Sequence, residues 1–144
     1  MSDSLHVVCP QCDGVNRVPR DRLGGGAKCG RCGTRLFAAE PVELDGQRFP
    51  QHISRSDIPV LVDFWAPWCG PCRLMAPAYA EAAASLEPEV RLVKVNTEQA
   101  QELSMRYGIR SIPSLLLFRN GAEVARTAGA MDARSLIAWT RQHL

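Results

Sequence analysis

The sequence predicts an α/β fold in which a mixed central sheet is flanked by helices, with a small cysteine-containing segment in front of it. Three observations support this prediction. The run VLVDFWA at residues 60–66 is apolar and β-branched, which is typical of a strand buried on both faces of a sheet. From residue 46 onward the expected elements follow the order β-α-β-α-β-β-α, which combines parallel strands with an antiparallel edge. The dipeptide Asn120-Gly121 between two strand-like runs marks a hairpin at that edge.

The first half of this fold contains two expected strands and one long helix. Residues 71–86 follow the strand at 60–66 and are rich in alanine, which favours a helix. Pro77 lies inside this helix and should kink it. Residues 90–96, VRLVKVN, form the second expected strand.

The second half contains a helix, the hairpin and a final helix. Residues 98–107 have apolar side chains along one helical face, and residues 114–127 form the hairpin. Asp132 can act as the N-cap of the final helix. The side chains expected to face inward are Ala100, Leu103 and Tyr107 in the first of these helices and Leu136, Ile137 and Thr140 in the second.

The N-terminal part of the chain has a different texture. Residues 1–40 consist of short apolar runs broken by turns, with too little apolar mass for an independent core. We therefore expect this domain to need a cross-link that holds it together. Residues 41–45 read as a polar linker, and residues 46–144 form the second domain.

Composition excludes several classes of protein. The chain has 144 residues, of which 46% are hydrophobic and 22% charged, and a net charge of +2. This balance is ordinary for a soluble globular protein and gives no reason to expect nucleic acid or a membrane as a partner. No apolar run suits a secretory signal or a membrane span. We therefore expect a cytoplasmic monomer, in a compartment where paired cysteines serve as metal ligands or catalysts rather than as structural disulfides.

All six cysteines lie in three Cys-x-x-Cys pairs, and the first two pairs form one pattern. CPQC at 9–12 and CGRC at 29–32 give C-x2-C-x16-C-x2-C, a spacing typical of structural zinc sites. Two tight turns facing each other can close four thiolates around Zn²⁺, and Gly14, Gly30 and Gly33 permit the positive φ angles that such turns need. Two disulfides are the alternative and suit the expected compartment poorly. The predicted zinc ligands are Cys9, Cys12, Cys29 and Cys32.

The third pair has a different context. Cys69 and Cys72 have no further cysteines to complete a metal site, and the three histidines are scattered along the chain. The pair lies between a buried strand and a helix, so Cys69 should sit at the helix N-terminus, where free N–H groups and the helix dipole favour a thiolate. This context favours redox chemistry, with Cys69 as an exposed nucleophile and Cys72 as a shielded resolving thiol.

The sequence resembles the thioredoxin family across residues 46–144. The resemblance rests on VLVDFWAPWCGPCRLMAP, on GIRSIPSLLLFRNG and on Gly129-Ala130, in the order and at the distances of the family. With four cysteines in front, the chain is similar to the zinc-containing second thioredoxins of bacteria. The resemblance implies a thioredoxin fold and a protein-disulfide reductase that is recycled by thioredoxin reductase and NADPH. Gly-Pro between the cysteines favours a reductant over an oxidant.

The resemblance also implies roles for further residues. From the sequence alone Asp63 would more often be a solvent-facing residue, but the family pattern makes it a buried proton acceptor with a raised pKa and Lys94 as its charge neighbour. Pro113 is expected to follow a cis peptide bond. The expected docking surface for substrates consists of Trp68, Gly70, Pro71, Ile112, Pro113, Gly129 and Ala130.

Two other functions remain open at this point. A thioredoxin fold can serve as a non-catalytic adaptor or holdase, which the intact WCGPC motif disfavours. An isomerase or oxidase would differ from a reductase in its redox potential.

Overall fold

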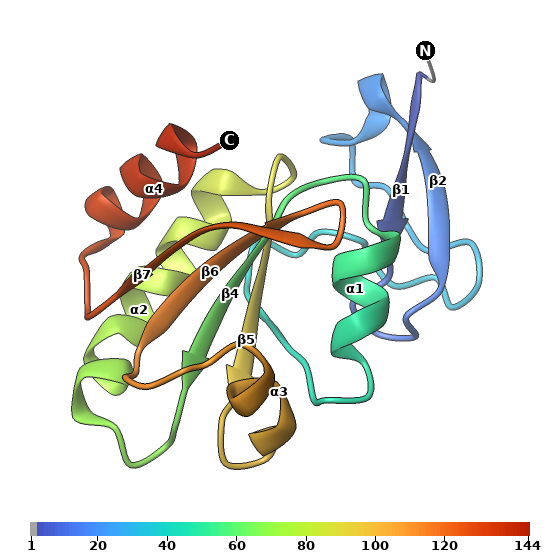
Figure 1. Cartoon of the computed structure of the whole chain (residues 1–144). Coiled ribbons are helices and arrows are strands. Elements are labelled where there is room, and N and C mark those ends of the chain that lie inside the picture. The colour runs from blue at the N-terminus through green and yellow to red at the C-terminus, as the bar shows by residue number, and fades with distance from the viewer. Residues whose placement is uncertain (1–2) are drawn as a thin grey trace.

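The computed structural model describes residues 3–144 and contains two sheets (Figure 1). The first sheet is an antiparallel pair, β1 (Ser4–Val8) and β2 (Val15–Pro19), followed by the short 3₁₀ helix η1 (Arg20–Arg22). The second sheet has five strands in the order β3-β5-β4-β6-β7. We call residues 3–40 the ribbon and the part of the chain that forms the second sheet the main domain.

The main domain has the mixed sheet and flanking helices that the sequence predicts. Strands β3, β5 and β4 are parallel, whereas β6 pairs antiparallel with both β4 and β7. The hairpin turns at Asn120 and Gly121, as expected. Its elements are β3 (Val42–Glu43), α1 (Phe49–Arg55), β4 (Val60–Trp65), α2 (Gly70–Leu86), β5 (Arg91–Asn96), α3 (Gln101–Arg106), β6 (Ser114–Arg119), β7 (Ala122–Ala128) and α4 (Ala133–Gln142).

Helices cover both faces of this sheet (Figure 1). Alternation along each strand sends Val62 and Phe64 toward α1 and α3, where they join one apolar cluster. Leu61 and Leu92 point to the opposite face and pack with α2 and α4 in a second cluster. Helix α4 begins as predicted, because the Asp132 carboxylate accepts a hydrogen bond of 2.8 Å from the backbone N–H of Ser135.

Two elements were not expected from the sequence. The segment predicted as a linker contains β3, a two-residue strand that pairs with β5 at the edge of the sheet. Helix α1 has only seven residues, too few to reveal a helical period, and it is held by Phe49 and Ile53, which are buried in the core. Helix α2 continues through Pro77. Among the described residues no helix is both long and apolar enough to cross a membrane.

The ribbon has a small apolar cluster of its own. Val7, Val18 and Leu36 are buried together with Cys9 and Cys29. Since two of these five residues are the predicted metal ligands, the cluster depends on whatever holds the cysteines together.

Arg91, the first residue of β5, fastens the ribbon to the main domain. It is 3% exposed, and its Nη2 donates to the carbonyl oxygens of Val8 at 3.2 Å and Leu36 at 2.7 Å. Its Nη1 lies 3.3 Å from Glu87, and its guanidinium stacks 4.5 Å from the centre of the Phe37 ring. A buried guanidinium with this many partners holds the ribbon at Val8 and at Leu36 against the main domain.

Asp13 makes a second contact between the ribbon and the main domain. Its carboxylate accepts hydrogen bonds from Arg48 Nε at 3.0 Å and Arg48 Nη2 at 2.8 Å, and it lies 2.7 Å from Nε2 of the buried His52. Arg48 Nη2 also donates to Pro10 at 2.7 Å. Although burial opposes ionisation, these partners hold the pKa of Asp13 below its ordinary value.

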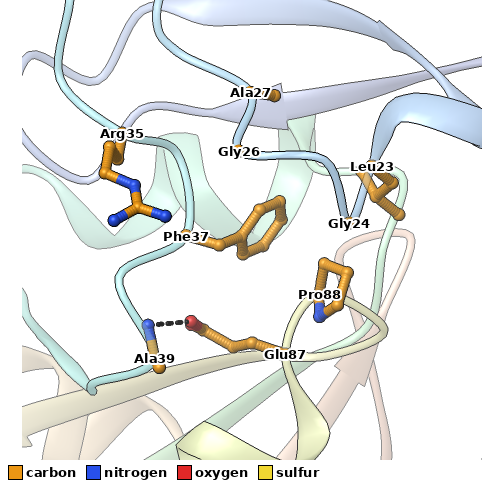
Figure 2. A pocket seen from close by; sticks show the side chains of 9 residues that line it. All are labelled: Leu23, Gly24, Gly26, Ala27, Arg35, Phe37, Ala39, Glu87 and Pro88. Carbon is orange, nitrogen blue, oxygen red and sulfur yellow. Dashed lines mark hydrogen bonds between the residues drawn. The ribbon is translucent and has the colours of Figure 1, made fainter.

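Figure 2 shows the junction between the ribbon and the main domain around Phe37 and Glu87. The Glu87 carboxylate accepts a hydrogen bond of 3.0 Å from the backbone N–H of Ala39, and Phe37 and Pro88 line a cavity of about 160 Å³ beside it. The ribbon therefore lies at the end of the sheet where β5 begins. The six residues of β5 span about 20 Å, so the opposite end of the parallel strands is well separated from the ribbon.

Candidate active site and metal centre

The four ribbon cysteines converge on one point. Their Sγ atoms all lie within 4.8 Å of one another. The Sγ atoms of Cys9 and Cys32 are 3.6 Å apart, and those of Cys12 and Cys29 are 3.7 Å apart. Four thiolates at about 2.3 Å from a central Zn²⁺ form a tetrahedron with edges of about 3.8 Å. The donor set and its spacing therefore fit a tetrahedral zinc ion.

The two cysteine turns have the same backbone pattern. The N–H of Cys9 donates to Gly14 and that of Cys29 donates to Thr34, both at 2.8 Å. The residue after each second cysteine has a positive φ, 64° at Asp13 and 79° at Gly33. The expectation of positive φ at Gly14 and Gly30 is wrong, because Asp13 adopts the left-handed conformation in the first turn. Aspartate tolerates it better than most residues do.

The third cysteine pair lies at the other end of the sheet. Strand β4 ends at Trp65, and the chain turns into α2 with Cys69 as its N-cap. Cys69 and Cys72 form a disulfide with Cα atoms 5.2 Å apart, and Cys69 Sγ lies 3.2 Å from the backbone N of Cys72. The expected contrast in exposure is absent in this disulfide form, since Cys69 is 4% exposed and Cys72 is 2% exposed. The helix begins at the disulfide, and both cysteines pack against Ala66, Trp65 and Ile112.

Asp63 lies in the interior rather than at a solvent-facing position. It is 1% exposed, and neither carboxylate oxygen has a hydrogen-bond partner among residues 3–144. Leu61 precedes Asp63 by two residues on β4, so both side chains point to the face of the sheet that α2 covers. Burial raises the pKa of Asp63 to about 7; the Lys94 ammonium opposes this shift and the Glu43 carboxylate adds to it.

Lys94 is the direct neighbour of Asp63 in the sheet. The two residues are register partners on the parallel strands β5 and β4. Its Nζ lies 4.4 Å from the centre of the Trp65 ring, a cation–π contact, and it forms no ion pair within 4.0 Å in the described part of the chain. The positive charge is thus near Asp63 but not bonded to it.

The structure brings several of the expected docking residues to the disulfide. The peptide bond between Ile112 and Pro113 is cis, and Cys69 Sγ lies 3.7 Å from the Ile112 carbonyl oxygen. The N–H of Gly129 donates to the carbonyl of Pro113 at 2.9 Å. Trp68, which is 67% exposed, borders the same region.

A groove of about 640 Å³ opens beside Trp68 and Ile112. The expected residues Gly70, Pro71, Gly129 and Ala130 are exposed outside it. Sequence reasoning missed most of its lining, although GIRSIP just before the β6 strand could have indicated it. The missed lining residues are Thr97, Gln101, Ser104, Met105, Ile109, Arg110 and Ser111.

Comparisons with known proteins match both parts of the chain. The family model for thioredoxins matches residues 40–142, and the model described as "Thioredoxin 2, N-terminal", a zinc ribbon, matches residues 8–34. The chain is 44% identical to thioredoxin C-3 of Corynebacterium nephridii over 138 residues, which is 96% of this chain and 94% of that protein. It is 47% identical to thioredoxin 1 of Nostoc over 102 residues, 71% of this chain and 95% of that protein.

A solved structure shows the same fold. A mutant thioredoxin from Halobacterium salinarum superposes with a TM-score of 0.67 at 30% identity, covering 74% of this chain and 93% of that one. The sequence comparisons, the fold and the Cys69–Cys72 disulfide all indicate the same family. The chain belongs to the thioredoxin family, as a thiol–disulfide oxidoreductase with an N-terminal zinc ribbon.

Proposed function

We propose that this protein reduces disulfides in other proteins through a Cys69–Cys72 dithiol cycle. The observation that carries the proposal is the disulfide at the N-terminus of α2, with the buried carboxylate of Asp63 on the strand beneath that helix. Family membership implies disulfide-containing proteins as substrates. The groove beside Trp68 supports this, because it is open and partly apolar and would admit an extended segment of a partner.

Cys69 is the nucleophile in this cycle. In the reduced form its thiolate attacks one sulfur of the substrate disulfide; a mixed disulfide forms and one substrate thiolate leaves. Two features of its position favour the thiolate. Cys69 caps α2, where the helix dipole favours negative charge, and the N–H of Cys72 points at its sulfur from 3.2 Å.

Cys72 is the resolving thiol, and Asp63 is its proton acceptor. Cys72 loses its proton to the Asp63 carboxylate and attacks Cys69 Sγ, which breaks the mixed disulfide and releases the second substrate thiolate. The substrate gains two electrons, and the enzyme is left as the Cys69–Cys72 disulfide. A carboxyl whose pKa is raised to about 7 by burial is suited to accept and return a proton near neutral pH.

The proposed docking surface for substrates consists of Trp68, Gly70, Pro71, Ile112, Pro113, Gly129 and Ala130. Their placement around the disulfide supports this assignment, since the Ile112 carbonyl lies beside Cys69 and the backbone of Gly129 is bonded to Pro113. Lys94 is proposed to act as the charge neighbour of Asp63.

The ribbon is proposed to bind one structural Zn²⁺ through Cys9, Cys12, Cys29 and Cys32. A bound zinc ion would supply the cross-link that fixes the two cysteine turns against each other. We propose residues 1–40 as the zinc ribbon, 41–45 as the linking segment, with β3 inside it, and 46–144 as the catalytic domain. Because the cycle needs a source of electrons, we also propose recycling by thioredoxin reductase with NADPH, in the cytoplasm, where thiols are kept reduced.

A coupled assay tests this function. The protein is incubated with a thioredoxin reductase, NADPH and a disulfide-bonded protein, and NADPH consumption is followed at 340 nm. We expect turnover that stops when Cys69 and Cys72 are both replaced by Ser. Absence of turnover in the intact protein would favour a non-catalytic adaptor or holdase, and a redox potential in the range of oxidants would favour an oxidase or isomerase.

A further inference from the structure

Glu43 completes a row of three charged residues across the sheet. Asp63 of β4 is the register partner of Lys94 of β5, and Lys94 is the register partner of Glu43 of β3. Register partners on neighbouring strands point to the same face and lie about 4.8 Å apart. The row therefore runs from the buried Asp63 to Glu43 on the side of the sheet that α2 covers.

The two carboxylates in this row have opposite environments. Asp63 is 1% exposed and has no hydrogen-bond partner among residues 3–144. Glu43 is exposed, because β3 is the edge strand. Lys94 is half-buried between them, and its ammonium is over the Trp65 ring rather than in an ion pair with either carboxylate. One cation is thus shared by two anions.

Few other groups can influence the charge of Asp63. On β6 its register partner is Leu115, which is apolar. From α2 the Tyr79 hydroxyl donates to the carbonyl oxygens of Leu61 and Val93, and its pKa is raised well above 10, so it stays neutral. Cys69 at the N-cap of α2 and Cys72 within the helix are joined in a disulfide in this form. The two charged residues of α2, Arg73 and Glu81, are exposed. Lys94 and Glu43 are the charges that remain.

We propose that Glu43 is a positioning residue that keeps Asp63 able to take up a proton near neutral pH, by competing with it for the Lys94 ammonium. This inference rests on the proposed function, in which Asp63 serves Cys72. With Glu43 present, the Lys94 charge is divided and ionised Asp63 is only partly compensated. Without Glu43, Lys94 stabilises the Asp63 carboxylate alone, and the carboxylate becomes a weaker base.

The test uses the full chain in its disulfide form, so that no catalytic thiol titrates. The ¹³C resonance of the Asp63 carboxyl carbon is followed against pH in the wild type, in Glu43→Gln and in Glu102→Gln; Asp63→Asn assigns the signal. Glu102 is an exposed carboxylate of α3 and serves as the matched control. We expect the midpoint to fall by about 0.3–1 pH unit in Glu43→Gln, to stay unchanged in Glu102→Gln and to return toward the wild-type value in Glu43→Asp. An unchanged midpoint in Glu43→Gln would overturn the proposal.

A second readout separates this proposal from the role of Asp63 itself. The rate of protein-disulfide reduction is measured against pH in Glu43→Gln, and its profile should move to lower pH with the Asp63 midpoint. If the midpoint moves and the rate profile does not, Glu43 acts as proposed and Asp63 is not the base. If Asp63→Asn alters the rate profile while Glu43→Gln moves neither quantity, Asp63 is the base and the assignment of Glu43 fails.

Discussion

The ribbon and the main domain, which is the proposed catalytic domain, contain the same Cys-x-x-Cys spacing in two different kinds of site. In all three pairs the backbone N–H four residues after the first cysteine donates to that cysteine's carbonyl, so each pair begins as the same turn. The difference lies in the donor residue. Asp13 and Gly33 have positive φ and send the chain back on itself, whereas Arg73 continues into α2. Two reversed turns facing each other make a four-sulfur cluster, and one continued turn makes a disulfide at a helix N-terminus.

The electrostatic settings of the two regions differ as well. The ribbon presents a charged group that is paired across its junction with the catalytic domain, since Asp13 of the ribbon forms an ion pair with Arg48. The catalytic domain keeps Asp63 buried without a hydrogen-bond partner in the described chain. Paired groups hold parts together, whereas an unpaired buried carboxyl destabilises the fold and suits proton transfer.

The largest expected effect separates the two cysteine sets by metal content. Because four thiolates from the ribbon complete one tetrahedral site, replacing Cys9 with Ser should lower zinc from one ion per chain to near zero after dialysis against a chelator. Structural zinc contributes about 10–16 kcal/mol in zinc-finger peptides. The control is Cys69→Ser combined with Cys72→Ser, which should keep one zinc by metal analysis. Zinc loss from that control would contradict the claim that only the four ribbon cysteines bind zinc.

Arg91→Met tests the junction between the regions. This change leaves Glu87, whose side chain is 2% exposed, without its ion-pair partner and removes the donors to Val8 and Leu36. Breaking a buried pair costs about 3–5 kcal/mol, so the free energy of unfolding in urea should fall by that amount. Arg126→Met removes an exposed pair with Glu123 and should cost less than about 1 kcal/mol. Equal losses in the two variants would mean that Arg91 does not fasten the ribbon.

Asp63→Asn should stabilise the protein in a pH-dependent way. In the unfolded chain this carboxyl ionises near its ordinary pKa of 3.8, and in the folded chain only near 7. Wild-type stability should therefore fall as pH rises from about 4 to 7, by up to about 4 kcal/mol, and then level off. The Asn variant lacks this slope, so its advantage should be near zero at pH 4 and largest above pH 7. Parallel stability curves from chemical denaturation would contradict the raised pKa.

The smallest of these effects concerns the backbone that distinguishes the turns. Gly33 has a φ of 79°, and no atom lies within 4 Å of the place where a Cβ would stand, so Gly33→Ala is a purely conformational change. It should cost about 1–2 kcal/mol and weaken zinc affinity about five- to thirtyfold. Gly30→Ala is the control, since Gly30 has no positive φ and its added Cβ would lie 3.8 Å from Asn16 Oδ1, an ordinary contact. Competition with a zinc-binding dye measures both.

Much of the catalytic domain could be predicted from sequence. The strand at 60–66, the hairpin at Asn120-Gly121 and the cap at Asp132 each carry a local signal, and each forms as expected. Helix α1 and strand β3 carry none, because seven and two residues are too few to show a period. Their places depend on tertiary contacts such as the burial of Phe49.

The site shows the same division. Cysteine spacing predicts which residues form each cluster, but not that Asp13 rather than Gly14 reverses the first turn. Arg91 reads in sequence as an ordinary strand residue, and its partners Val8 and Leu36 lie 83 and 55 residues away. Glu43 falls in a segment that looks like a linker, and only the pairing of β3 with β5 places it beside Lys94. Long-range pairing of this kind leaves no local pattern.

The most direct test of the catalytic assignment is trapping of the mixed disulfide. Cys72→Ser and Cys69→Ser are each mixed with a disulfide-bonded protein and separated by non-reducing electrophoresis. With Cys69 as nucleophile, Cys72→Ser should attack but not resolve, so covalent adducts accumulate on Cys69 and disappear on reduction. Cys69→Ser should trap little substrate, because Cys72 is buried in the first turn of α2 and, unlike Cys69, does not cap the helix. Equal trapping by the two variants, or stronger trapping by Cys69→Ser, would contradict the account.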